Sequence, residues 1–378
     1  MDKTKKKTAG FWKTHWLVIL TGLLIGAAAV ALTALGNPKN MGFCIACFER
    51  DIAGALHFHE AGAVQYFRPE IVGIVLGAML ISMLTKEWRP QGGSSPITRF
   101  IVGMLVMIGA LVFLGCPLRM VIRIGGGDLN ALVGLLGFIV GILIGVIPLK
   151  LGFSLGRAYR QNKAEGLVFP ILLAVLFVLS LVTELFAATE PGDPTKPGGL
   201  RAAWWIALLI ALVVGALCQR SRLCMAGGIR DVVLFRDFHL ILGFAAIIVA
   251  VLLGNWILGG FKVAVKDGAL ILGNAKFSFA GQPVAHTDAW FNFLGMVMVG
   301  WGSVLLGGCP LRQLVLAGEG NSDSALTVLG FLAGAAVSHN FGLASSGKGI
   351  GSGPVLWMLL AGFGILLLVS VFHTKRRV

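Results

Sequence analysis

The sequence has little charge: only 13% of its 378 residues are Asp, Glu, Lys or Arg, whereas 57% are hydrophobic and the mean hydropathy is +0.88. A soluble domain of this size cannot hide so much apolar surface. Several stretches approach the ~20 uncharged residues that cross a ~30 Å hydrocarbon core as a helix. The class indicated is an all-α, polytopic integral membrane protein.

Acidic residues are scarcer still, with 17 against 31 basic ones and a net charge of +14. The basic residues form short clusters between apolar runs, which is typical of membrane loops, so we expect no nucleic-acid partner. Gly125-Gly126-Gly127 lacks the Gly-Lys-Ser/Thr that would complete a phosphate-binding loop. Nothing resembles a nucleotide-binding domain. We expect no enzyme and no cofactor, and direct use of ATP would require another chain.

We predict ten membrane spans. Their approximate ranges are 16–35, 69–86, 98–115, 129–148, 167–188, 201–217, 238–258, 290–308, 324–341 and 354–372. The basic run at residues 3–7 precedes an uncleaved first span, because no convincing cleavage site for a signal peptide follows. The segment 259–289 reads as an external excursion whose alternating residues predict a hairpin with a turn at Asp267-Gly268.

The basic clusters give the orientation. With the N-terminus in the cytoplasm, every dense cluster falls on the cytoplasmic side, in agreement with the positive-inside rule. The clusters comprise Lys86, Arg89 and Arg99; Lys150, Arg157, Arg160 and Lys163; Arg220, Arg222, Arg230 and Arg236; and Lys375-Arg376-Arg377. We therefore expect a multi-pass protein of a bacterial-type inner (cytoplasmic) membrane, with both termini in the cytoplasm.

Two motifs occur twice. Cys44-Ile45-Ala46, followed by Arg50-Asp51, returns 180 residues later as Cys224-Met225-Ala226, followed by Arg230-Asp231. Gly115-Cys116-Pro117-Leu118-Arg119 returns 193 residues later as Gly308-Cys309-Pro310-Leu311-Arg312. The sequence thus divides into two repeats, residues 1–190 and 191–378.

Each repeat contains five predicted spans, and an odd number of crossings turns the second copy upside down. Cys44 and Cys116 then lie on re-entrant loops that enter from outside, and Cys224 and Cys309 on loops that enter from inside. Non-helical backbone at membrane depth is tolerated where it lines a cavity. We expect the four loops to meet near the midplane and to line a central pathway.

The residue types favour an anionic, sulfur-containing solute. Proline suits the first position of a helix, so Cys116 and Cys309 are predicted at helix N-termini, where free N–H groups attract anions. A thiol is a weak donor and a soft acceptor. One turn further on, Arg119 and Arg312 can attract an oxyanion or pair with Asp51 and Asp231. Arg50, Asp51, Arg230 and Asp231 are expected to act as supporting charge partners.

The C-x-x-C motif, two histidines and Cys218 allow roles other than solute contact. Cys44 and Cys47 form a C-x-x-C that could be a disulfide or a redox dithiol, although Gly227 occupies the second position in the other repeat. His57 and His59 suggest a metal site, but the matching segment 234–239 of the other repeat does not repeat the pair of histidines, so we expect none. Cys218 has no counterpart and is expected to pack in the core.

The motifs at Cys44, Cys116 and Cys309 and the inverted duplication resemble the YeeE/YedE family of sulfur-transport membrane proteins, over nearly the whole chain. The resemblance implies an hourglass-shaped interior in which these three cysteines pass the solute along, with Cys224 as the symmetry mate of Cys44. Cys44-Ile45-Ala46-Cys47 is more like the YedE branch, linked to selenium metabolism, than like the thiosulfate branch. Both a thiosulfate-like anion and a selenium species stay open. Membrane lipid and a cytoplasmic sulfur carrier of the small sulfurtransferase kind are the implied partners.

The leading hypothesis is a transporter or facilitator that imports a small sulfur or selenium solute for biosynthesis. The main alternative is a membrane thiol:disulfide oxidoreductase that relays reducing equivalents through Cys116 and Cys309. A third hypothesis is a scaffold that recruits soluble enzymes. The redox relay requires these two thiols to form a disulfide during turnover, whereas solute relay requires them only to contact the solute in turn.

Overall fold

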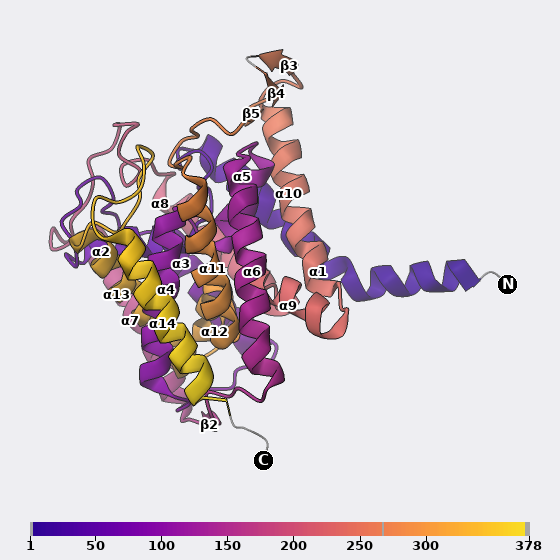
Figure 1. Ribbon diagram of the computed structural model, residues 1–378, viewed down its shortest axis with the longest axis vertical. Helices are drawn as coiled ribbons and strands as arrows, with labels where there is room; N and C mark the ends of the chain where they lie inside the picture. The colour runs from indigo at the N-terminus through magenta and orange to yellow at the C-terminus, as the bar shows by residue number, and fades with distance from the viewer. Residues whose placement is uncertain (1–2, 267, 375–378) are drawn as a thin grey trace.

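The computed structural model describes residues 3–266 and 268–374, which form a bundle of helices with short strands at its two ends (Figure 1). The helices of the first half are α1 (Lys3–Ala34), α2 (Ile45–Ala55), α3 (Pro69–Leu84), α4 (Pro96–Phe113), α5 (Pro117–Gly125), α6 (Asn130–Lys150) and α7 (Lys163–Val182). Those of the second half are α8 (Trp204–Ser221), α9 (Met225–Phe235), α10 (His239–Leu258), α11 (Ala289–Leu305), α12 (Pro310–Gly318), α13 (Ser322–Asn340) and α14 (Val355–Phe372).

The order of long and short helices is the same in both halves. The second helix of each half, α2 or α9, has 11 residues, and the fifth, α5 or α12, has 9. Pro117 and Pro310 stand at the start of α5 and α12, where a residue without a free N–H costs no hydrogen bond. The repeated motifs therefore fall at equivalent points of the two helix series.

All ten segments predicted as spans are helical. Within the described residues, eight helical stretches are long and apolar enough to cross a membrane, so the fold is consistent with a polytopic membrane protein. The predicted segment 69–86 gives the shorter apolar helix α3, of 16 residues. The predicted segment 324–341 falls on α13, which is not among the eight and carries Asp323, Thr327 and His339. The count of ten spans stays a prediction.

Long helices pair across the two halves. α1 packs on α10 and α8 packs on α3, while α6 packs on α11 and α13 packs on α4. Glycines allow the backbones to approach closely: a Cβ at Gly77 of α3 would overlap the carbonyl oxygen of Leu212 in α8. At Gly141 of α6 it would overlap that of Val297 in α11. Such small-residue contacts are how membrane helices pack without a hydrophobic driving force.

One end of the bundle holds the strands β1 (Gln91–Gly92) and β2 (Tyr159–Arg160), which pair with each other. Gln91 also bridges to Asn321, and Phe153 bridges to Thr374, so distant connections gather here. Figure 1 shows β2 at the lower end, near the C-terminus. We call this the β1–β2 end.

The opposite end holds the antiparallel strands β3 (Val263–Lys266), β4 (Ala269–Leu272) and β5 (Ala275–Phe277) (Figure 1). β3 and β4 confirm the predicted hairpin, although Asp267 of its turn lies outside the described residues. We call this the β3–β5 end. The connection that follows α2 also contacts the end of α13, in the other half: the side-chain amide of Asn340 donates to the carbonyl of Phe58 at 2.9 Å.

Basic residues from several predicted clusters lie at the β1–β2 end. Arg160 belongs to β2, and Arg220 forms an ion pair with Glu87 at 2.7 Å. Arg89 and Arg222 line a cavity there together with Glu87. The predicted gathering of these residues on one side therefore agrees with the fold, whereas the predicted cluster Lys375-Arg376-Arg377 lies outside the described residues.

Candidate functional site

Cys44 and Cys224 occupy equivalent positions, each capping a short helix. The backbone of both is extended, and the sulfur of Cys44 accepts a hydrogen bond from the N–H of Cys47 at 3.3 Å. The sulfur of Cys224 accepts one from the N–H of Gly227, also at 3.3 Å. Ser, Thr, Asp and Asn usually fill this role. The segments predicted as non-helical loops are therefore mostly helix, since α2 and α9 begin directly after these cysteines.

Cys116 and Cys309 are also helix caps, as predicted from the proline that follows each of them. Both have extended backbones, and α5 and α12 start at the next residue. The four motif cysteines thus precede the N-termini of four short helices, where free N–H groups and the helix dipole give a positive potential.

The four cysteines form two pairs, one in each half. The sulfurs of Cys224 and Cys309 are 3.8 Å apart, and the N–H of Cys309 donates to the sulfur of Cys224 at 3.4 Å. The thiol of Cys44 lies beside that of Cys116. All six cysteines are buried and free of disulfides.

Each pair therefore joins the N-termini of two short helices around two sulfurs. Such a site provides soft donors and acceptors, backbone N–H groups and a positive potential, but no hard carboxylate at the sulfurs themselves. A sulfur or selenium anion is the kind of ligand that this combination suits. The sequence predicted the cysteines individually, whereas their pairing within each half was not foreseen.

Arg119 does not pair with Asp51, so that alternative of the sequence analysis is wrong. Its guanidinium donates to the carbonyls of Asn40 at 2.8 Å and Val284 at 2.7 Å, and also to that of Leu114. It further approaches the sulfur of Cys47 at 3.4 Å. Backbone carbonyls thus satisfy this buried cation, which lies against the C-x-x-C of the first half.

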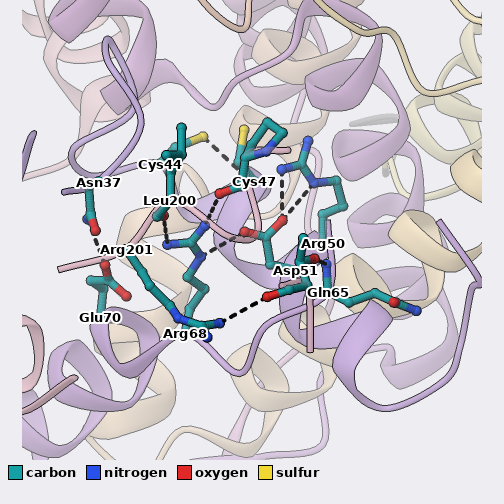
Figure 2. Close-up of polar contacts among 12 residues, drawn as sticks. Asn37, Cys44, Cys47, Arg50, Asp51, Gln65, Arg68, Glu70, Leu200 and Arg201 are labelled. Atoms are coloured by element: carbon teal, nitrogen blue, oxygen red, sulfur yellow. Dashed lines mark hydrogen bonds and ion pairs between the residues drawn. The ribbon is translucent and has the colours of Figure 1, made fainter. Parts of the chain in front are cut away.

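Asp51 instead bridges two other arginines (Figure 2). One carboxylate oxygen pairs with Arg50 at 2.7 Å and the other with Arg68 at 2.7 Å, with all three side chains almost fully buried. Arg68 also donates to the carbonyls of Pro197 and Leu200, at 2.8 and 3.2 Å. Arg68 was not singled out from the sequence, because it belongs to neither repeated motif.

The second half is arranged differently. Asp231 pairs with Arg230 at 2.8 Å and does not pair with Arg312. Arg312 pairs at 3.1 Å with Glu319, which follows α12. Burial raises the pKa of Glu319 above its usual value, although Arg312 opposes this shift. The predicted pairing of Arg312 with Asp231 is therefore wrong, because an acid on its own helix end is closer at hand.

Arg312 and Glu319 border a cavity of about 360 Å³ at the β1–β2 end. Its other lining residues are mostly polar and comprise Glu87, Arg89, Gln91, Gln219, Arg222, Leu316 and Asn321. A second cavity, of about 300 Å³, lies at the β3–β5 end and is lined by Lys39, Asn40 and Gln282, among others. Asn40 is the residue whose carbonyl accepts from Arg119. The molecule therefore has a hollow on the side of each thiol pair, with a mostly polar lining at the β1–β2 end and a mixed lining at the β3–β5 end.

The remaining candidates have local partners. The ring of His57 contacts the carbonyl of Leu185 at 3.2 Å, and that of His59 contacts the carbonyl of Arg50 at 3.1 Å. Burial lowers the pKa of His59. Cys47 is free, so it forms no disulfide with Cys44 here. Cys218 lies within the buried apolar core, in agreement with the predicted packing role.

The comparison with protein families gives one match. The model of a family described as Sulphur transport matches residues 220–373, which contain Cys224 and Cys309 with their short helices α9 and α12. Comparison with curated proteins found no match. The family match supports a membrane transporter of sulfur compounds. The second half of the chain is thus similar to the sulphur-transport family that the repeated cysteine motifs resemble.

Proposed function

We propose that the protein imports a small sulfur- or selenium-containing solute across the membrane by way of its two thiol pairs. The observation that carries this proposal is the pairing of Cys44 with Cys116 and of Cys224 with Cys309, each at two converging helix N-termini. The family match over the second half supports the same function.

The proposed architecture is a pair of inverted repeats, residues 1–190 and 191–378, with ten membrane crossings. The identical order of long and short helices supports it, as does the reciprocal packing of α1 on α10 and α8 on α3. An odd number of crossings per repeat would turn one thiol pair toward each membrane face. Because basic residues gather at the β1–β2 end, we assign that end and both termini to the cytoplasm of a bacterial-type inner membrane.

The positions of the two cavities and the two thiol pairs suggest a path for the solute. A solute enters the cavity at the β3–β5 end, meets Cys44 and Cys116, passes to Cys224 and Cys309, and leaves through the cavity beside Arg312. A thiol bonds weakly to a terminal sulfur or selenium, so no single pair holds the solute tightly. The positive potential of the helix N-termini offsets the cost of bringing an anion into the membrane interior.

The redox alternative is less well supported. It requires Cys116 and Cys309 to exchange a disulfide, whereas each of these thiols lies beside the other motif cysteine of its own half. Transport requires no bond between the two pairs, only a solute small enough to contact them in turn.

Uptake by purified protein in proteoliposomes tests the proposal. Counterflow against thiosulfate, selenite, selenide and sulfide should identify the accepted solute. Cys116→Ala and Cys309→Ala should each reduce uptake to background. Cys218→Ala is the matched control, because Cys218 is equally buried but belongs to neither repeated motif. Unchanged uptake in both Cys116→Ala and Cys309→Ala would contradict the thiol pathway.

We also propose that a soluble sulfur carrier of the small sulfurtransferase kind receives the solute at the β1–β2 end. The mixed charges of the cavity there, with Arg222 and Arg312 beside Glu87 and Glu319, suit a polar protein surface. Loss of carrier binding in Arg222→Ala, with uptake unchanged, is the expected result. Binding that survives in this variant would separate the carrier from this cavity.

A further inference from the structure

Glu49 is a buried acid without a partner. It lies on α2, between the motif residues Cys44 and Asp51, and its exposed fraction is 1%. Within the part of the chain that the structure describes, neither of its carboxylate oxygens has a hydrogen-bond partner. Asp51, two residues further on, is equally buried but is held by Arg50 and Arg68. Glu49 therefore has none of the compensation that a buried charge normally requires.

Glu49 lines an apolar cavity of about 50 Å³ between α2, α3, α7 and α13. All other lining residues are apolar, and they are Ile52, Leu56, Phe67, Ile71, Phe169, Leu172, Leu173, Leu176, Val328, Leu329 and Leu332. No charged or titratable group other than Glu49 lines this cavity. An ionised carboxylate there would be very costly, so the neutral acid is the stable form.

Charged and titratable groups on the surrounding elements are engaged elsewhere. On α2 and just before α3, Arg50 and Arg68 both pair with Asp51 (Figure 2). At the start of α3, Glu70 accepts a hydrogen bond from Asn37 at 2.8 Å. On α7, Lys163 and Glu165 lie exposed in the first turn. On α13, Asp323 accepts from Ser94, and His339 stacks on His59.

The cavity reaches the outer surface of the bundle. Two of its lining residues, Leu172 and Leu329, are 50% and 43% exposed. They belong to α7 and α13 and are apolar, so this surface faces lipid in the proposed architecture. An apolar reagent dissolved in the hydrocarbon region can therefore approach this cavity, whereas a water-soluble reagent has no aqueous route through its apolar lining.

The repeat shows that the fold does not require this acid. Arg50 and Asp51 have counterparts in Arg230 and Asp231, but the residue at the position equivalent to Glu49 is Ile229. Ile229 is also buried. An apolar residue thus fills the same place on α9, and Glu49 is an addition to the first half. Ionisable residues within membranes usually mark ion or proton pathways.

We propose that Glu49 is a proton-binding site that couples solute import to proton movement, an inference that rests on the proposed transport function. The carboxylate takes one proton from the side of the β3–β5 end and releases it toward the cytoplasm, and no electrons are exchanged. Loss of the proton leaves an unpaired charge in an apolar cavity, so α2 must shift to expose it. Because Cys44 caps α2, this shift would move the first thiol pair.

Dicyclohexylcarbodiimide tests the protonated acid directly, because this apolar reagent converts neutral carboxyl groups into stable N-acylureas. Peptide mass spectrometry of the full-length protein in liposomes should find Glu49 modified, and the modification should decrease as the pH rises. Glu49→Gln should abolish this adduct, while Glu165→Gln, which removes an exposed acid of α7, should leave it unchanged. Absence of the adduct in the wild-type protein at all pH values would overturn the proposal.

Proton movement tests the coupling. Liposomes that contain a pH-sensitive dye should acidify during thiosulfate uptake by the wild-type protein. Glu49→Gln should abolish this acidification while solute exchange by counterflow persists, because exchange needs no net proton transfer. Wild-type uptake without acidification, or acidification that survives in Glu49→Gln, would overturn the coupling. If no solute is transported at all but Glu49 is still modified, the transport proposal fails and the proton site stands.

Discussion

The two thiol pairs have the same arrangement of helix caps, but the charged residues around them differ in burial. In the first half, Asp51 and its arginines are almost fully buried, and Arg119 is held by carbonyls. In the second half, the side chains of Arg230 and Asp231 are 27% and 18% exposed. Arg312 there borders a polar cavity. The charged groups around the first pair are therefore buried, whereas those around the second are partly exposed. The difference indicates that water reaches the charged residues of the second half more easily.

Substitution of the two equivalent aspartates gives the largest expected contrast. Asp51→Asn leaves Arg50 and Arg68 buried without a counter-charge, which should cost about 3–5 kcal/mol. Asp231→Asn breaks a partly exposed pair, which should cost about 0–1 kcal/mol. Thermal unfolding of the detergent-purified variants measures both. Equal destabilisation by the two substitutions would contradict the difference in enclosure.

Thiol labelling measures the same contrast as a rate. We expect Cys224 to react with a small methanethiosulfonate reagent roughly tenfold faster than Cys44, a difference of about 1.4 kcal/mol in activation free energy. The physical reason is the small exposure of Cys224, 5% against 0% for Cys44, and the partly exposed charged groups of the second half. The measurement uses variants that retain a single motif cysteine, in detergent so that both ends are accessible. Faster reaction of Cys44 would contradict this difference in exposure.

Much of the fold was accessible to prediction from the sequence, because it follows from local rules. Apolar runs of sufficient length gave helices at all ten expected positions. The proline after Cys116 and after Cys309 correctly predicted helix starts. The alternation after Phe261 correctly predicted the hairpin of β3 and β4. Each of these features depends on residues close together in the chain.

The candidate site was less predictable, because its contacts join distant segments. Nothing near Asp51 in the sequence marks Arg68 as its partner, and the carbonyls that hold Arg119 include that of Val284. Cys44 and Cys224 were not expected as helix caps, since cysteine is not a preferred capping residue. Glu49 was not singled out from the sequence, because its distinguishing feature is burial without a hydrogen-bond partner, which a sequence does not reveal. Repetition identified the candidate segments but not their contacts.

The ion pair between Glu87 and Arg220 at the β1–β2 end gives the smallest expected effect. Glu87 pairs with Arg220, and both side chains are about 40% exposed. Hydrogen bonds from Gln219 and then from Arg220 hold the pKa of Glu87 below its usual value. A depressed carboxyl pKa contributes stability above the pKa of the unfolded chain, and this contribution is lost as the pH falls through the folded-state pKa. Because solvent screens the pair, Glu87→Gln should cost only about 0–1 kcal/mol at pH 7.

Thermal unfolding of the wild-type protein and Glu87→Gln, measured from neutral to acidic pH, should therefore converge as Glu87 becomes protonated. A large cost at pH 7, comparable with that of Asp51→Asn, would mean that Glu87 is shielded from water. The charged groups at the β1–β2 end would then be as enclosed as those around Asp51. A small and vanishing difference instead supports a hydrated β1–β2 end, because solvent screening weakens an exposed ion pair.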